Sequence, residues 1–200
     1  DKHNTYLEEE FEAGSAYKPN KADWLEGQWS GMTVAYGDDR RGDTAVPIDT
    51  LNKIGDVMTT VPPEFQVHSK LQRVLNTRSQ AIKTGKNLDW ATAEHLAFGS
   101  AVLDGFVVRL SGQDSCRGTF SQRHAVFVDQ RSEERYVPLA NLSAEQAKFE
   151  VIDSPLSEAS VMGFEYGFAQ AEPNAIVMWE AQFGDFANGA QVVIDQFISS

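Results

Sequence analysis

Three short polar segments contain the side chains whose types and spacing could do chemistry. The first, residues 111–124, holds Gln113, Asp114 and His124 among glycines, arginines and small hydroxyl residues, directly after an apolar stretch. This composition is typical of a loop that lines a pocket. It is not a phosphate-binding loop, because neither the G-x-G-x-x-G spacing nor the P-loop spacing occurs in it. A polar crossover loop without a function explains the same composition.

The second segment, residues 153–158, ends in Glu158, which we place in the first turn of a predicted helix that follows a strand. Most glutamates at such positions only complement the helix dipole, a contribution of about 0.3–1 kcal/mol. The functional alternative is a carboxyl group at a strand–helix junction, directed into a cleft.

The third segment, residues 179–188, contains Gln182, two phenylalanines, Phe183 and Phe186, and several other polar groups. Phenylalanines are most often core residues. They can also form a stacking surface for a planar ligand.

Cys116 is the only cysteine, and the four histidines are scattered along the chain. A nucleophilic cysteine needs a nearby base that lowers its pKa. Nothing in the sequence brings His124 to Cys116, which favours a small buried hydrophobic role for the thiol. The spacing of these residues matches no zinc site, so we assign no metal ligand.

Strand and helix patterns alternate in the second half of the chain. We predict strands at residues 106–110, 149–152 and 175–179, and helices at residues 89–103, 156–169 and 186–197. Such an order predicts an α/β fold with a mainly parallel sheet flanked by helices. Ligands bind at the carboxyl ends of such strands. These ends are residues 111–114, 153–158 and 180–186, which places the three polar segments at one edge. Residues 126–128 and 135–137 additionally predict a hairpin.

The first half has a different pattern. Helical spacing covers residues 44–59 and 67–85, residues 18–21 form a break, and no alternating strand pattern is present. We therefore predict a mostly helical and irregular connector over residues 1–86, followed by the α/β part over residues 87–200.

The composition excludes several classes of partner. Of the 200 residues, 17 are basic and 29 acidic, for a net charge of −12. This argues against binding to nucleic acid and against attachment to an anionic membrane. No apolar run is long enough to span a bilayer, and we expect no secretory signal in the first residues, which have no apolar stretch. A single cysteine fits a reducing compartment. Because there is no initiator Met and the last residues continue a helical pattern, we expect a piece of a longer chain.

Three segments carry a specific resemblance that extends over nearly the whole chain. A close resemblance to the decarboxylating component of the 2-oxoglutarate dehydrogenase complex, which depends on thiamine diphosphate, is carried by residues 110–114 with 117–124, residues 153–158 with 163–167, and residues 179–189 with 195–200. Residues 18–24 and 87–94 are similar to it as well. The resemblance implies that residues 87–200 are the N-terminal part of a transketolase-like, pyrimidine-binding domain. It also implies that residues 1–86 link it to the diphosphate-binding domain, and that magnesium is bound by a domain outside this chain.

The resemblance also implies site residues. Glu158 is the acid that donates a proton to the pyrimidine ring of the cofactor, and Phe186 lies against the face of that ring. Gln113, Asp114 and Gln182 bind the cofactor, and His124 takes part in catalysis. Besides these, Arg117 or Arg123 has a charge suited to attracting a dicarboxylate substrate.

The implied activity is oxidative decarboxylation of 2-oxoglutarate, with transfer of the succinyl unit to a lipoyl group in the tricarboxylic acid cycle. The piece alone is expected to be inactive. The implied partners are a second copy in a homodimer, the lipoyl-bearing succinyltransferase and dihydrolipoyl dehydrogenase, in the bacterial cytoplasm or mitochondrial matrix. Two alternatives stay open: the decarboxylating component of another 2-oxo acid dehydrogenase, and a non-catalytic interaction domain.

Overall fold

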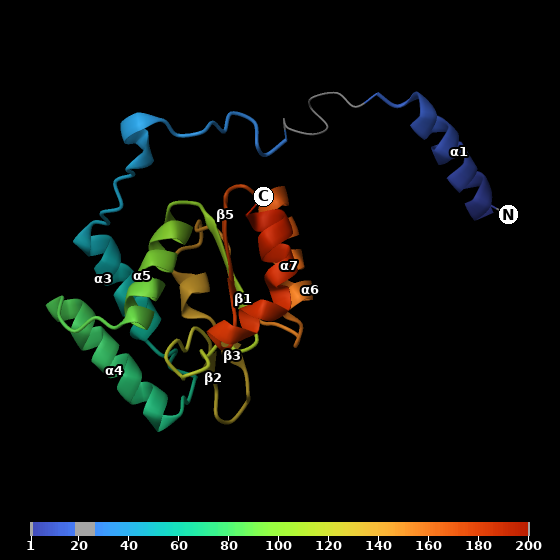
Figure 1. Cartoon of the computed structure of the whole chain (residues 1–200). Helices are drawn as coiled ribbons and strands as arrows, with labels where there is room; N and C mark the ends of the chain where they lie inside the picture. Colours follow the sequence, from blue (N-terminus) through green and yellow to red (C-terminus); the bar gives the residue numbers. More distant parts are fainter. Residues whose placement is uncertain (1, 19–26, 200) are drawn as a thin grey trace. The chain divides into compact units, whose positions relative to one another are not determined.

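The computed structural model describes residues 2–18 and 27–199 and divides the chain into two compact units, Asp1–Gly42 and Asp43–Ser200 (Figure 1). In the first unit, helix α1 (Lys2–Ala16) has no buried residue, and a short 3-10 helix, η1, spans Gly37–Arg40. The predicted break at residues 18–21 and the segment 18–24 lie largely outside the described residues. Within the described ranges, no helix is long and apolar enough to cross a membrane.

The second unit is built on a parallel sheet. Among the described residues, β1 (Val107–Gly112), β4 (Phe149–Asp153) and β5 (Ala175–Glu180) form a three-stranded sheet in the order β4-β1-β5. Leu110 of the central strand pairs in register with Val151 on one side and with Met178 on the other. This confirms the predicted strands and the predicted α/β class.

Helices cover both faces of the sheet (Figure 1). Side chains alternate along a strand, so even and odd positions of β1 face opposite ways. Val108 and Leu110 join the core on the side of α5 (Trp90–Leu103), whereas Arg109 contacts Glu165 of α6 (Glu158–Ala171) on the other side.

Two helices before residue 86 pack onto this core. Helix α3 (Ile48–Thr59) lies against α5 and against α4 (Ser69–Thr84). Glycines allow the close approach: a Cβ atom on Gly99 of α5 would lie 2.5 Å from Ile54 Cγ2, and one on Gly55 of α3 would lie 2.7 Å from Ile82 Cγ2. The division into a linker and a pyrimidine domain at residue 86 stays a prediction.

Local signals place most helix ends as expected. Asp89 caps α5 by accepting a hydrogen bond from the backbone N–H of Thr92 at 2.7 Å, and α4 ends at Gly85, which has a φ of 64°. The predicted hairpin is confirmed as β2 (Phe127–Val128) paired antiparallel with β3 (Arg135–Tyr136). A 3-10 helix, η2 (Pro138–Asn141), then leads towards β4.

Two predicted helices have different bounds. The predicted start at residue 156 is wrong, because the N–H of Ser157 donates to the carbonyl of Pro155 at 2.9 Å. This tight turn leaves Ser157 extended, so α6 can begin only at Glu158. The single helix predicted at residues 186–197 is divided into η3 (Gly184–Ala190), α7 (Gln191–Val193) and a π-helical turn, η4 (Ile194–Ile198). Gly184 and Gly189 in η3 have low helix propensity.

The contact between α3 and α5 predicts the effect of Gly99→Ala. The added methyl group would collide with Ile54, which is fully buried, and overpacking of this kind costs about 1–3 kcal/mol. Gly163→Ala is the matched control, because a Cβ atom there meets nothing within 4 Å and alanine should stabilise α6 by about 0.5–1 kcal/mol. Urea unfolding of both variants should show opposite shifts in midpoint; equal midpoints would contradict the described packing.

Candidate functional site

The three polar segments meet at the carboxyl edge of the sheet. β1 ends at Gly112 and β5 at Glu180, and these two residues are paired in register. A side chain at Gly112 would collide with the carbonyl oxygen of Glu180 and would lie 2.6 Å from Ser115 Oγ. Glycine therefore allows the chain after β1 to turn directly over the end of β5.

Glu158 and Gln113 form the central contact of this edge. Gln113 Nε2 donates a hydrogen bond of 2.8 Å to Glu158 Oε1. Glu158 is the first residue of α6 and is half-buried. Its other oxygen, Oε2, faces Gly189 of η3: a Cβ atom added to Gly189 would lie only 3.1 Å from Oε2. The carboxyl group is thus held between a neutral amide and a glycine backbone.

An aromatic segment, residues 181–186, follows β5. The ring of Phe183 makes edge-to-face contacts with Phe186, at 5.9 Å between centroids, and with Phe120, at 5.7 Å. All three rings remain substantially exposed, with 41% of Phe186 accessible. Gln182, in the same segment, is half-buried. Exposed aromatic faces of this kind suit the stacking of a planar ring.

The pocket loop, residues 113–124, is tied together by its own hydrogen bonds. The backbone N–H groups of Arg123 and His124 both donate to the carbonyl of Arg117 at 2.9 Å. Gly118 has a φ of 84°, and Gln122 lies where a side chain at Gly118 would be. Ser121 and His124 also have positive φ angles, 55° and 50°, which are unfavourable for residues other than glycine.

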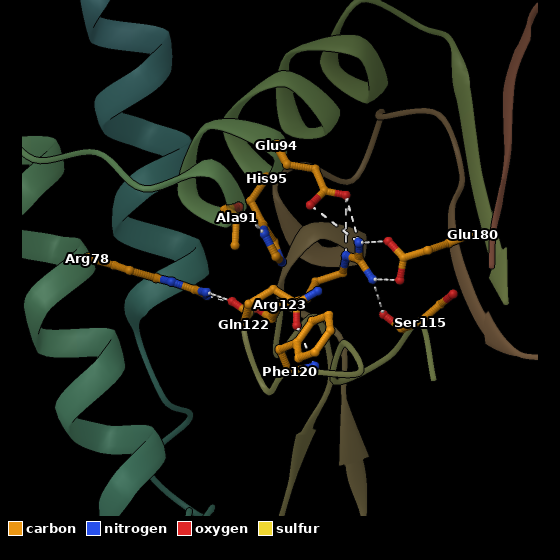
Figure 2. A network of polar contacts seen from close by, with 9 residues as sticks. All are labelled: Arg78, Ala91, Glu94, His95, Ser115, Phe120, Gln122, Arg123 and Glu180. Carbon is orange, nitrogen blue, oxygen red and sulfur yellow. Dashed lines mark hydrogen bonds and ion pairs between the residues drawn. The ribbon is translucent and has the colours of Figure 1, made fainter. Parts of the chain in front are cut away.

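A buried ionic network anchors this loop (Figure 2). The side chain of Arg123 is 3% exposed and forms a two-pronged ion pair with Glu180, with one N–O distance of 2.9 Å. Arg123 also pairs with Glu94 of α5 at 3.1 Å and donates to the carbonyl of Ser115 at 3.1 Å. Burial alone would lower the pKa of Arg123, but the bonds to Glu180 and Glu94 raise it above its usual value.

Two further buried residues border the network. Arg78 of α4 donates to the carbonyl of Arg123 at 2.9 Å and to that of Gln122. His95 Nδ1 lies 2.7 Å from the carbonyl of Ala91. Burial, with the nearby charges of Arg78 and Arg123, lowers the pKa of His95 to about 4, so the ring is neutral at pH 7.

The predicted site residues are brought together only in part. Gln113 contacts Glu158, and Phe186 belongs to the aromatic segment. Asp114 forms an ion pair with Arg117 instead. His124 is half-buried and lines a cavity of about 510 Å³ with residues near the start of α4, among them His68. Burial and then the charge of Arg78 lower the pKa of His124.

The structure also corrects the interpretation of Arg123. Its guanidinium is already occupied by two carboxylates, which argues against the expected attraction of a substrate carboxylate. The sequence patterns missed its partners Glu94 and Glu180 and the position of Gly189. Only the presence of charged residues, such as Glu94 and Glu180, next to apolar helix and strand positions could have indicated such pairs. In the part of the chain that the structure describes, no group of three or more His, Cys, Asp and Glu side chains could hold a metal ion.

Cys116 has the environment of an inert thiol. It is 7% exposed, its N–H donates to Asp153 Oδ1 at 2.8 Å, and Sγ lies 3.6 Å from the carbonyl of Val151. Burial, followed by the negative charge of Asp153, raises the pKa of the thiol to about 11. The structure therefore agrees with the non-nucleophilic interpretation.

This environment predicts slow alkylation of Cys116. A pKa of about 11 leaves very little thiolate at pH 8, and burial slows access of the reagent further. Because Cys116 is the only cysteine, mass spectrometry after iodoacetamide treatment at pH 8 reports on it alone. We expect little labelling of the folded chain and complete labelling in guanidinium. Rapid labelling of the folded chain would show that the thiol is exposed or activated.

Comparison with known proteins places this geometry in a family. Residues 86–200 match the family described as the transketolase pyrimidine-binding domain. Over 196 residues the chain is 59% identical to the 2-oxoglutarate dehydrogenase E1 components of Brucella canis and Brucella suis, and 58% identical to that of Brucella anthropi. These alignments cover 97% of this chain and 20% of each relative, so the chain spans about a fifth of the relatives' length. The chain belongs to the family of transketolase pyrimidine-binding domains.

Proposed function

We propose that this chain is the part of a 2-oxoglutarate dehydrogenase E1 component that holds the aminopyrimidine ring of thiamine diphosphate. The family match over residues 86–200 and the 59% identity to proteins of that name support the proposal. The observation that carries it is the position of Glu158, at the first turn of α6 between Gln113 and Gly189 and near the edge where the aromatic segment begins.

The residues present fit this group. A half-buried carboxyl group, a neutral amide and an exposed phenylalanine face suit an aminopyrimidine, which is planar and has ring nitrogens that form hydrogen bonds. Gly189 leaves space beside Glu158 Oε2 that any larger residue would fill. When bound, thiamine diphosphate supplies the nucleophilic thiazolium carbon and the electron sink for decarboxylation of a 2-oxo acid.

In this proposal each residue has a separate task. Glu158 holds a proton on Oε2 for the ring nitrogen, because Oε1 already accepts the hydrogen bond from Gln113. Gln113 thereby orients the carboxyl group. Phe186 would offer its exposed face to the ring, and Phe183 supports Phe186 through an edge-to-face contact. We keep Asp114 and Gln182 as proposed cofactor-binding residues, and His124 as a proposed catalytic residue that would act from the neighbouring cavity that it lines.

The wider assignment follows from the same relatives. The magnesium ion would be bound outside this chain, by the domain that holds the diphosphate. The complete protein would act as a homodimer and pass the succinyl unit to a lipoyl-bearing succinyltransferase, with dihydrolipoyl dehydrogenase as the third component. The relatives named above are bacterial, which favours the bacterial cytoplasm over the mitochondrial matrix.

Glu158→Gln tests the proposal in the full-length E1 component that contains this sequence. Glutamine keeps the shape and the contact with Gln113 but cannot transfer a proton, a loss that commonly slows a reaction about 10²–10⁴-fold. We expect near-normal melting temperature, somewhat weaker binding of thiamine diphosphate, and much slower exchange of the thiazolium proton with deuterated water. Exchange at the wild-type rate would return Glu158 to the role of a helix-dipole residue and favour an interaction domain.

Gly189→Ala tests the space beside the carboxyl group. A Cβ atom 3.1 Å from Oε2 makes the carboxyl group shift by a few tenths of an ångström, and this displacement should weaken binding of thiamine diphosphate several-fold. Gly167→Ala in α6 is the control, since its Cβ atom meets nothing within 4 Å. Isothermal titration of thiamine diphosphate with magnesium should show the loss only in Gly189→Ala. Equal affinities in the two variants would contradict the proposed location.

A further inference from the structure

The two sides of the proposed cofactor site belong to segments far apart in the sequence. Gln113, which orients Glu158, begins the pocket loop after β1, whereas Phe183 and Phe186 follow β5. We infer that Arg123 is a positioning residue that fixes these two sides relative to each other. This role rests on the proposed function, and it concerns a residue that does not itself touch the cofactor.

The contacts of Arg123 join both sides. At one end it binds Glu180, the last residue of β5, through both carboxylate oxygens, and Gln182 and Phe183 follow within three residues. At the other end it lies in the pocket loop and donates to the carbonyl of Ser115, two residues after Gln113. The ion pair with Glu94 attaches the whole arrangement to α5 (Figure 2).

The loop needs such an anchor because its conformation is strained. Ser121 and His124, on either side of Arg123, have positive φ angles, which the surrounding structure must enforce. Arg78 holds the carbonyls of Gln122 and Arg123 from the side of α4. Loss of the Arg123 contacts would let the loop relax, moving Ser115 and Gln113 relative to the aromatic segment.

Arg109 makes comparable ion pairs that do not involve the pocket loop. It also makes a two-pronged ion pair, with Glu165 at 2.7 and 3.0 Å, and a second ion pair with Glu150 at 2.9 Å. Its guanidinium lies over the rings of Phe164 and Phe168. These contacts attach β1 to α6 and β4, on the face of the sheet away from the buried network. Arg109 is therefore a matched control for the loss of a buried arginine fork.

The experiment compares Arg123→Lys with Arg109→Lys in the full-length E1 component. Lysine keeps the charge but loses the planar fork that binds a carboxylate through two bonds. We expect both variants to lower the melting temperature. Only Arg123→Lys should also raise the apparent dissociation constant for thiamine diphosphate and slow exchange of the thiazolium proton, by about 10- to 100-fold, the range that misplacement on the ångström scale produces.

A second variant covers the case in which Arg123→Lys does not fold. Glu180→Gln keeps the size of the side chain at a position that is 32% exposed, and it removes the charge that Arg123 binds. We expect it to slow the exchange in the same direction. In the double variant, the two substitutions should together slow exchange by less than the product of their separate effects, because they break one interaction.

Three outcomes would overturn the positioning role. One is a folded Arg123→Lys protein whose cofactor affinity and exchange rate stay within about twofold of wild type; another is the same change in Arg109→Lys. The third is wild-type exchange in Glu180→Gln when Arg123→Lys does not fold. The outcome for the proposed function is separate: slow exchange in Glu158→Gln with normal exchange in Arg123→Lys removes the positioning role alone. Normal exchange in Glu158→Gln removes the proposed function itself.

Discussion

A buried guanidinium group needs carboxylate or carbonyl partners, because an unpaired charge in the interior is strongly unfavourable. Arg123 meets this requirement with Glu94 and Glu180, and the requirement shapes the edge of the sheet. The end of β5, the start of α5 and the return of the pocket loop must all come to one point. Gly112 permits the same convergence from the other direction, because it lets β1 pass against the carbonyl of Glu180. The position of Gln113 beside Glu158 follows from these two constraints together.

Regular elements could be predicted from the sequence because their signals are local. The apolar strands around Val108, Phe149 and Val177 pair in parallel as expected, and Gly85 ends α4 through its left-handed conformation. The start of α6 could not be predicted in this way. Ser154 and Pro155 are a reasonable helix start by residue type, and only the turn between Pro155 and Ser157 moves the first helical residue to Glu158.

Position along the chain predicts only those site residues that directly follow a strand. Glu158 and Phe186 follow strands, so a parallel sheet must place them at one edge. Arg123, by contrast, binds residues that are 29 and 57 positions away, and no local pattern reports such a pair. For this reason an arginine that looked available to a substrate is instead fully engaged within the fold. The resemblance to a known family indicated the segments that matter but gave no role to the charges that hold them.

The distribution of arginines around Glu158 agrees with the chemistry proposed for it. A cation beside a carboxyl group favours its ionised form, which could not donate a proton to a ring nitrogen. Among the described residues, Arg78 binds loop carbonyls, Arg109 binds Glu165 and Glu150, and Arg123 binds Glu94 and Glu180. The described contact of Glu158 is the neutral amide of Gln113. The fold thus uses its buried cations as structural ties and gives a polar but uncharged partner to the carboxyl group of Glu158.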